Sequence, residues 1–153
     1  MRPPTMRPGE YPPRLATGAF IRHSGLQKWD ADQDTAEGLH GMAVRAYPVL
    51  SHLPPDRFVR LLSAAEITTG SALLLPLVPT ALAGAALTAF SGALVGLYAR
   101  TPGLREPGSP WPTERGIGLS KDSWMLGIGV GLLVEALTRA VSADGEADGR
   151  AEG

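Results

Sequence analysis

The sequence predicts an all-α fold, a transmembrane four-helix bundle with a short hairpin between helices 2 and 3. Residues 67–99 form a run of 33 residues without a charged side chain, too long for one membrane crossing of about 20 residues. Pro76 and Pro79 divide this run, and another apolar run follows at 123–137. Because so small a chain has little polar surface to cover such helices, the sequence favours a membrane as their solvent.

The first predicted span, residues 14–29, is the most polar. It carries Arg22, His23 and Lys28, and hydropathy alone would place it on a membrane surface as an amphipathic helix. The segment before it, residues 1–13, holds five prolines and is predicted to be a disordered tail.

Prolines, glycines and charged residues mark the limits of the other predicted helices. An acidic segment contains a short predicted helix at 35–46, which Pro48 ends. The second and third spans are predicted at 58–76 and 79–99, and a loop rich in proline and glycine follows them. The fourth span is predicted at 119–140, with Lys121 and Asp122 at its start. The whole membrane domain is thus residues 14–140, and the acidic residues 141–153 are predicted to be a disordered tail.

Composition excludes several functions. The formal net charge of −1 gives no electrostatic reason to expect a nucleic-acid partner. The chain has no cysteine, and its three histidines lie far apart, so the sequence predicts no metal site and no thiol chemistry.

Small residues recur at a spacing of four in the last two spans. Such rows let helix backbones approach closely in a membrane, within one bundle or across a dimer. The predicted packing residues are Gly84, Thr88, Gly92 and Gly96 in the third span and Gly127 and Gly131 in the fourth.

Glu66 lies within an apolar run, about 12 Å of helical rise from Phe58. A charged residue at that depth normally faces the bundle interior and is paired. The sequence therefore predicts a polar cluster in which Glu66 meets Arg22, His23 or Lys28 of the first span. One interpretation is an ion pair that fixes how the helices dock. The other is a site for a small polar group, such as a quinone head or an oxyanion.

Three motifs resemble those of DoxX-like membrane proteins of actinobacterial type, in the same order and at similar spacing. They are SGLQKW at 24–29, AAEITTGSALLL at 64–75 and LSKDSWMLGIGVGLLV at 119–134, within a resemblance that covers about 14–138. The positions that match the family motifs are Gly25, Lys28, Glu66, Gly70, Lys121 and Asp122.

The resemblance implies a four-helix, multi-pass protein of the bacterial plasma membrane. It also implies an accessory membrane subunit of a quinone-linked or redox complex, with a quinone as ligand and a soluble oxidoreductase as partner. The sequence shows no cofactor motif, so we expect no independent catalytic activity and expect a partner to carry any redox centre. One alternative is a structural membrane bundle without chemistry. A further alternative, a small transporter, is disfavoured because few polar residues line the predicted spans.

Overall fold

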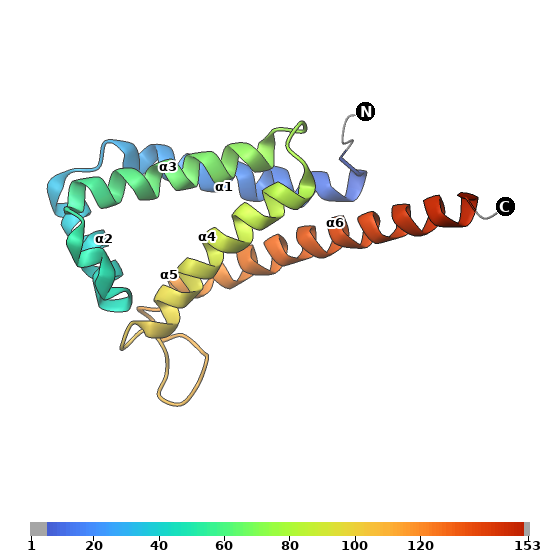
Figure 1. Ribbon diagram of the computed structural model, residues 1–153. Helices are drawn as coiled ribbons and strands as arrows, with labels where there is room; N and C mark the ends of the chain where they lie inside the picture. The colour runs from blue at the N-terminus through green and yellow to red at the C-terminus, as the bar shows by residue number, and fades with distance from the viewer. Residues whose placement is uncertain (1–5, 152–153) are drawn as a thin grey trace.

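The computed structural model describes residues 6–151, with side chains described as far as residue 143, and its regular structure is helical. The all-α prediction is confirmed: residues 6–151 contain no β-strand, only an isolated bridge between Arg105 and Pro112. The elements, in order, are η1 (Pro8–Glu10), α1 (Tyr11–Trp29), α2 (Gln33–Ala46), η2 (Pro48–His52), α3 (Pro55–Leu74), α4 (Thr80–Arg100), α5 (Ile117–Ser120) and α6 (Asp122–Ala151) (Figure 1).

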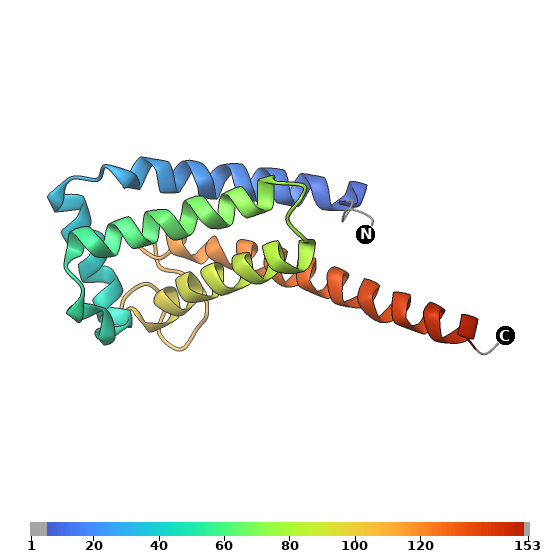
Figure 2. The same ribbon diagram turned by 45° about the horizontal axis from the view of Figure 1, so that its top comes forward.

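The four long helices form two antiparallel pairs, α1 with α3 and α4 with α6 (Figures 1 and 2). The short turn at 75–79 joins the pairs, as the two prolines predicted. Contact between the pairs is much sparser than contact within them. Helix α1 starts and α6 finishes at one end of the molecule, which we call the terminal end. Helix α2 lies across the other end, which we call the α2 end.

Glycines set the spacing of the first pair. A Cβ added at Gly70 would lie 2.6 Å from the backbone nitrogen of Arg22 and 2.7 Å from the carbonyl oxygen of Gly18. A Cβ added at Gly25 would lie 2.8 Å from the Cβ of Glu66. Since backbone and Cβ atoms cannot yield as a flexible side-chain tip can, α1 and α3 reach this distance only with glycine at these positions.

The second pair uses only part of the predicted small-residue face. A Cβ added at Gly84 would lie 3.0 Å from the backbone nitrogen of Leu133, and one added at Gly129 would lie 2.7 Å from the hydroxyl oxygen of Thr88. Gly84 and Thr88 therefore lie in the α4–α6 interface. Gly92 does not pack closely, because its nearest neighbour would be a leucine methyl 4.0 Å away.

Within this bundle, Gly127 and Gly131 do not pack against a helix, so that part of the prediction is wrong. Both are exposed, and a Cβ added at either would meet no atom within 4 Å. Gly129 takes that role, because two residues correspond to about 200° around a helix and place it on the opposite face.

Gly96, the last of the small residues predicted to pack in the third span, contacts the hydroxyl of Tyr47, which donates a hydrogen bond to the carbonyl of Ala93 (2.8 Å).

Both predicted tails contain helix. Pro8–Glu10 forms a 3₁₀ turn and α1 already begins at Tyr11, so the prediction of a disordered segment over 1–13 is wrong for residues 8–13. The prolines there occupy the first helical turn, where their missing N–H groups would have no intrahelical partner. At the other end, α6 continues to Ala151, because no proline interrupts the chain beyond residue 140. Residues 1–5 and 152–153 lie outside the described part.

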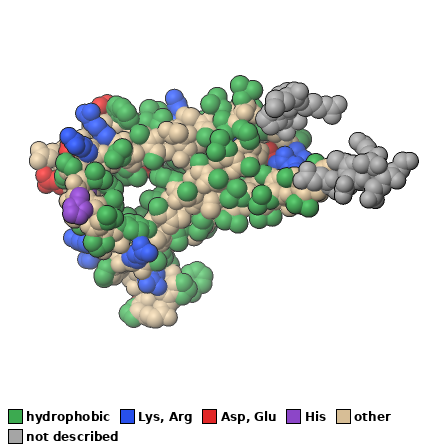
Figure 3. Space-filling model, in the orientation of Figure 1, with side chains coloured by type: hydrophobic (Ala, Val, Ile, Leu, Met, Phe, Trp, Pro, Cys, Tyr) green, Lys and Arg blue, Asp and Glu red, His purple; other side chains and the backbone are tan. Residues whose placement is uncertain are grey.

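Large apolar side chains lie on the surface of the bundle, and several polar side chains lie inside it. Figure 3 shows hydrophobic side chains over much of the visible outer surface. Phe20 is 70% exposed and Leu82 is 61% exposed, whereas Arg14 and Ser91 are fully buried. Among the described helices, Thr80–Arg100 and the stretch Ile117–Ala143 are long and apolar enough to cross a membrane.

Candidate functional site

Lys28 of α1 and Glu66 of α3 form an ion pair inside the bundle. The ammonium nitrogen of Lys28 lies 3.0 and 3.1 Å from the two carboxylate oxygens of Glu66, which is only 6% exposed. The ammonium also donates a hydrogen bond to the hydroxyl oxygen of Ser24 at 2.5 Å. The hydroxyl of Ser24 lies 3.4 Å from one oxygen of Glu66. Lys28 is thus the cation of the first helix that was predicted to pair with Glu66.

The close backbones of α1 and α3 place this pair. Ser63, one turn before Glu66, donates a hydrogen bond of 2.6 Å from its hydroxyl to the carbonyl of Gly25. Gly25 and Lys28 lie three residues apart and so share the helix face that meets α3. Arg22 and His23 are exposed and form no hydrogen bond or ion pair with Glu66, so their predicted place in the cluster is wrong. The backbone nitrogen and Cβ of Arg22 lie opposite Gly70, about one turn along α3 from Glu66.

A cavity of about 320 Å³ opens beside the pair, between the two helix pairs. Figure 3 shows an opening through the molecule in this region, between α2, α3 and α4. The walls are mainly apolar and include three phenylalanines, Phe20, Phe58 and Phe90, with Leu94 of α4. The polar residues that line it are Ser24, Lys28, Glu66 and Asp122.

Asp122 brings a second carboxylate to the cavity. It is the first residue of α6, directly after the break between α5 and α6 at Lys121. Within residues 6–143, no hydrogen bond or ion pair reaches its carboxylate, and it lines the same cavity as Glu66 and Lys28. Lys121 is exposed and does not line the cavity. Of the two motif residues at the start of α6, only Asp122 belongs to the site.

A second, more polar cavity of about 560 Å³ lies where α1 ends and α2 and α3 begin. Its lining includes Asp30, Glu37, Asp56 and Arg60, all exposed, and it also includes Lys28. Lys28 therefore lies between a polar cavity at the α2 end and the apolar cavity inside the bundle.

Another polar cluster lies at the terminal end and was not predicted. The guanidinium of Arg14, fully buried, donates hydrogen bonds to backbone carbonyls at the end of α3 and in the following turn. The acceptors are Ala72 (2.9 Å), Leu73 (2.9 Å), Leu75 (3.0 Å) and Val78 (3.2 and 3.3 Å). The side chain also reaches the hydroxyl oxygen of Thr80 at 3.2 Å. Arg14 therefore binds carbonyls that a helix end leaves without partners.

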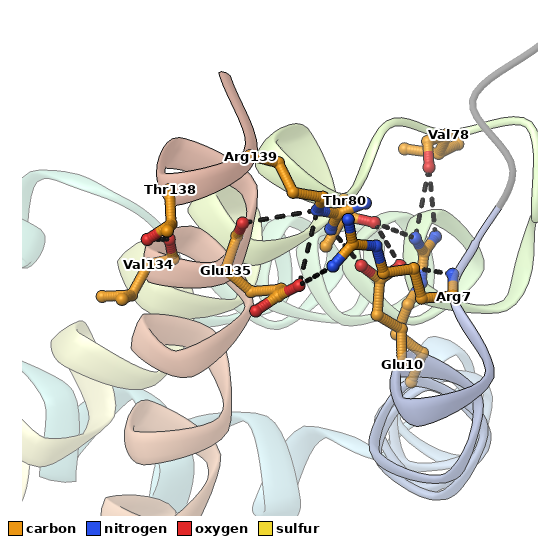
Figure 4. Close-up of polar contacts among 9 residues, drawn as sticks. Arg7, Glu10, Val78, Thr80, Val134, Glu135, Thr138 and Arg139 are labelled. Atoms are coloured by element: carbon orange, nitrogen blue, oxygen red, sulfur yellow. Dashed lines mark hydrogen bonds and ion pairs between the residues drawn. The ribbon is translucent and has the colours of Figure 1, made fainter. Parts of the chain in front are cut away.

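Side chains of α6 complete this cluster (Figure 4). Arg139 forms an ion pair with Glu10, whose other carboxylate oxygen accepts a hydrogen bond of 2.7 Å from the hydroxyl of Thr80. Arg7 forms an ion pair with Glu135 at 3.1 Å, and both of these side chains are substantially exposed. The cluster thereby links the start of α1 to α6. The prolines around Glu10 hid this role, because they made residues 1–13 resemble a disordered tail.

Neither polar cluster has the ligands of a metal site. Within the described residues, no group of three histidine, aspartate, glutamate or cysteine side chains could hold a metal ion. Nor does any buried side-chain nitrogen or oxygen atom there lack a hydrogen-bond partner. Comparisons with models of protein families, with curated proteins and with solved structures found no match to this chain.

Proposed function

We propose that the chain is a multi-pass membrane protein of DoxX type, whose α1/α3 and α4/α6 pairs cross a bacterial plasma membrane as a four-helix bundle. The inverted distribution of side chains supports this proposal. Large apolar side chains such as Leu82 and Leu137 face outward, whereas Arg14 and Glu66 face inward and are paired. In a bilayer, outward apolar side chains contact lipid, and ionisable groups gather inside the bundle.

The proposed topology has an even number of crossings, because α1 starts and α6 finishes at the terminal end. Reporter fusions at Met1 and Gly153 test it. We expect both reporters on the same side of the membrane. Reporters on opposite sides would rule out four spans and leave the polar helix α1 on the membrane surface.

We further propose that the cavity between the helix pairs binds a small amphipathic molecule of the quinone class. The cavity carries this proposal: about 320 Å³, apolar walls, and polar side chains from α1, α3 and α6 that converge at one place. Ligand sites in proteins commonly combine an apolar lining with a few placed polar groups. A ring would contact the phenylalanines, and the opening between α2, α3 and α4 would let an apolar tail reach the lipid.

The role that we propose is that of an accessory subunit in a redox or quinone-linked complex. The bundle holds the quinone at a fixed depth in the membrane, and a soluble oxidoreductase exchanges electrons with it. The polar cavity at the α2 end would be the water-facing side from which such a partner approaches, because its exposed lining residues are mostly charged.

Mass spectrometry of gently solubilised protein tests for the ligand and the partner in one experiment. We expect a bound quinone in the parent protein, and a soluble oxidoreductase retained with it. Leu94→Trp should remove the quinone, because the larger side chain fills the cavity. Leu82→Trp is the matched control, since Leu82 lies on the same helix and faces outward. Equal quinone content in both variants, or none in the parent, would contradict quinone binding in this cavity.

A structural bundle without ligand is the second candidate function. Lys28 finds all its hydrogen-bond partners in Glu66 and Ser24, and this favours the structural candidate. An ion pair that is complete without a ligand is explained by its orienting α1 against α3. This candidate predicts that filling the cavity by Leu94→Trp raises stability and removes no bound molecule. The same mass spectra and a thermal unfolding curve distinguish the two candidates.

A further inference from the structure

We infer that the cavity takes its ligand as a hydrogen-bond donor to Asp122, so that a hydroquinone binds there more tightly than the corresponding quinone. The inference rests on the proposed function and names the form of the ligand that the site selects. It comes from the supply of hydrogen-bond donors and acceptors that line the cavity.

The side-chain donors in the cavity are already occupied. The ammonium of Lys28 donates to the hydroxyl oxygen of Ser24 at 2.5 Å and to the carboxylate of Glu66 at 3.0 and 3.1 Å. The hydroxyl of Ser24 lies within 3.4 Å of the same carboxylate. A ligand that brings only acceptor atoms, such as a quinone with its two carbonyls, would have to break one of these contacts to gain a hydrogen bond.

An acceptor, by contrast, remains available. The carboxylate of Asp122 lines the cavity, and no donor within residues 6–143 reaches it. The ionisable groups around the cavity are one cation, Lys28, and two carboxylates, Glu66 and Asp122. A quinone carbonyl placed at Asp122 would set two acceptors against each other. A phenolic hydroxyl placed there would donate to a charged acceptor, which is a stronger bond than one between neutral groups.

The walls select the rest of the ligand. Phe20, Phe58 and Phe90 come from three different helices and line the same cavity. Aromatic side chains in such a setting favour a flat ring over a flexible chain. The hydroxyl of a ring-bearing alcohol therefore fits both the apolar walls and the free carboxylate. No covalent or redox step is part of this inference, which concerns binding alone.

A pair of ligands that differ only in their hydroxyl donor tests the inference in purified protein in detergent, under nitrogen to keep the naphthol from oxidising. The first is 2-methyl-1-naphthol, which has one hydroxyl donor, and the second is its methyl ether, which has none. We expect the naphthol to bind roughly tenfold or more tightly than the ether, as expected for a hydrogen bond to a charged acceptor. The quinone 2-methyl-1,4-naphthoquinone should resemble the ether. Isothermal titration calorimetry measures all three affinities.

Two variants locate the effect. Asp122→Asn should reduce the preference for the naphthol severalfold, since the amide oxygen is a weaker acceptor than the carboxylate. Asp56→Asn is the matched control, because Asp56 is also an acidic residue in the first turn of a long helix but does not line this cavity. It should leave the preference unchanged. The ligand comparison in the parent protein stands even where Asp122→Asn fails to fold.

The outcomes separate the inference from the proposed function. Equal binding of the naphthol, its ether and the quinone would overturn the inference and leave a ligand site in the cavity. A preference that persists in Asp122→Asn would assign the acceptor to another residue and also overturn it. Tighter binding of octylammonium than of the naphthol would make the carboxylate a site for cations. Absence of binding by every probe would overturn the proposed function together with the inference.

Discussion

The two ends of the bundle use buried charges differently. At the terminal end, Arg14 donates to carbonyls at the end of α3, and Glu10 joins Thr80 to Arg139 of α6. At the α2 end, Lys28 and Glu66 are also paired, but they adjoin a cavity in which the carboxylate of Asp122 has no partner among residues 6–143. Neither end could be assigned a role from charge alone. The difference lies in what surrounds each cluster.

Arg14 donates the hydrogen bonds that water would otherwise supply to the carbonyls at the end of α3. The last carbonyls of an α-helix have no partner in their own helix, and in an apolar environment each one left bare is costly. One guanidinium with several donors serves them together and leaves no space for a ligand. The cluster at the α2 end leaves both an apolar cavity and an acceptor free. We therefore interpret the terminal end as the structural lock and the α2 end as the ligand site.

The largest effect should come from Arg14→Met. The change leaves the α3 carbonyls without donors and Glu10 with one cation fewer nearby, and removing one partner of a buried polar set costs about 3–5 kcal/mol. We expect the yield of folded protein and its melting temperature in detergent to fall sharply. Arg22→Met is the control on the same helix, because Arg22 is exposed, and it should change stability by about 0.5 kcal/mol or less. Similar losses in the two variants would contradict the structural lock.

The next largest effect concerns Lys28 and Glu66. Lys28→Met should destabilise the protein by about 3 kcal/mol, near the lower limit for a buried pair, because Lys28 is itself 24% exposed at the polar cavity. Glu66→Leu should cost a similar amount. The double variant should lose less than the two single losses added, since no charge is then left unpaired. Unfolding curves of the parent, both single variants and the double variant measure this coupling. Additive losses would mean that the pair does not hold α1 against α3.

A smaller effect separates close packing from free surface. Gly70→Ala should destabilise the protein by about 1–3 kcal/mol, because its Cβ would overlap the backbone of α1. Gly127→Ala should instead stabilise it by up to about 1 kcal/mol, since the new methyl meets nothing and alanine favours helix. Melting temperatures of the two variants provide the test. Destabilisation by Gly127→Ala would place that residue in a contact within this bundle or with a second copy.

The smallest effect is expected at the exposed rim of the structural lock, which is the ion pair between Arg7 and Glu135. Arg7 and Glu135 pair at 3.1 Å, but their side chains are 60% and 44% exposed. Pairs of this kind contribute about 0–1 kcal/mol. Arg7→Gln should therefore lower the melting temperature only slightly, and less at high salt, where the lost attraction is already screened. A loss as large as that of Arg14→Met would show that the lock depends on its rim.

Much of the fold follows from local features of the sequence. The uncharged run with its two prolines predicted helices at 58–76 and 79–99, and α3 and α4 meet across a turn at 75–79. Pro48 ended a helix predicted at 35–46, which is Gln33–Ala46 in the structure. The depth of Glu66 predicted a cation from the first helix. These predictions succeeded because helix limits, and the residues that share a face, depend on spacing along one chain segment.

The rest required the tertiary structure, because spacing does not determine how one helix is rotated towards another. A helical stretch that is apolar on all sides, such as residues 124–134 of α6, gives no signal for which face meets its neighbour, so Gly129 packs against Thr88 where Gly127 was predicted. The level of each residue along the α1–α3 interface selects Lys28 for Glu66, because Arg22 lies opposite Gly70, about one turn further along α3. Arg14 finds its acceptors 58–64 residues away, on backbone carbonyls that no side-chain pattern reveals. The cavity and the free carboxylate of Asp122 exist only where six helices converge, and only packing brings them together.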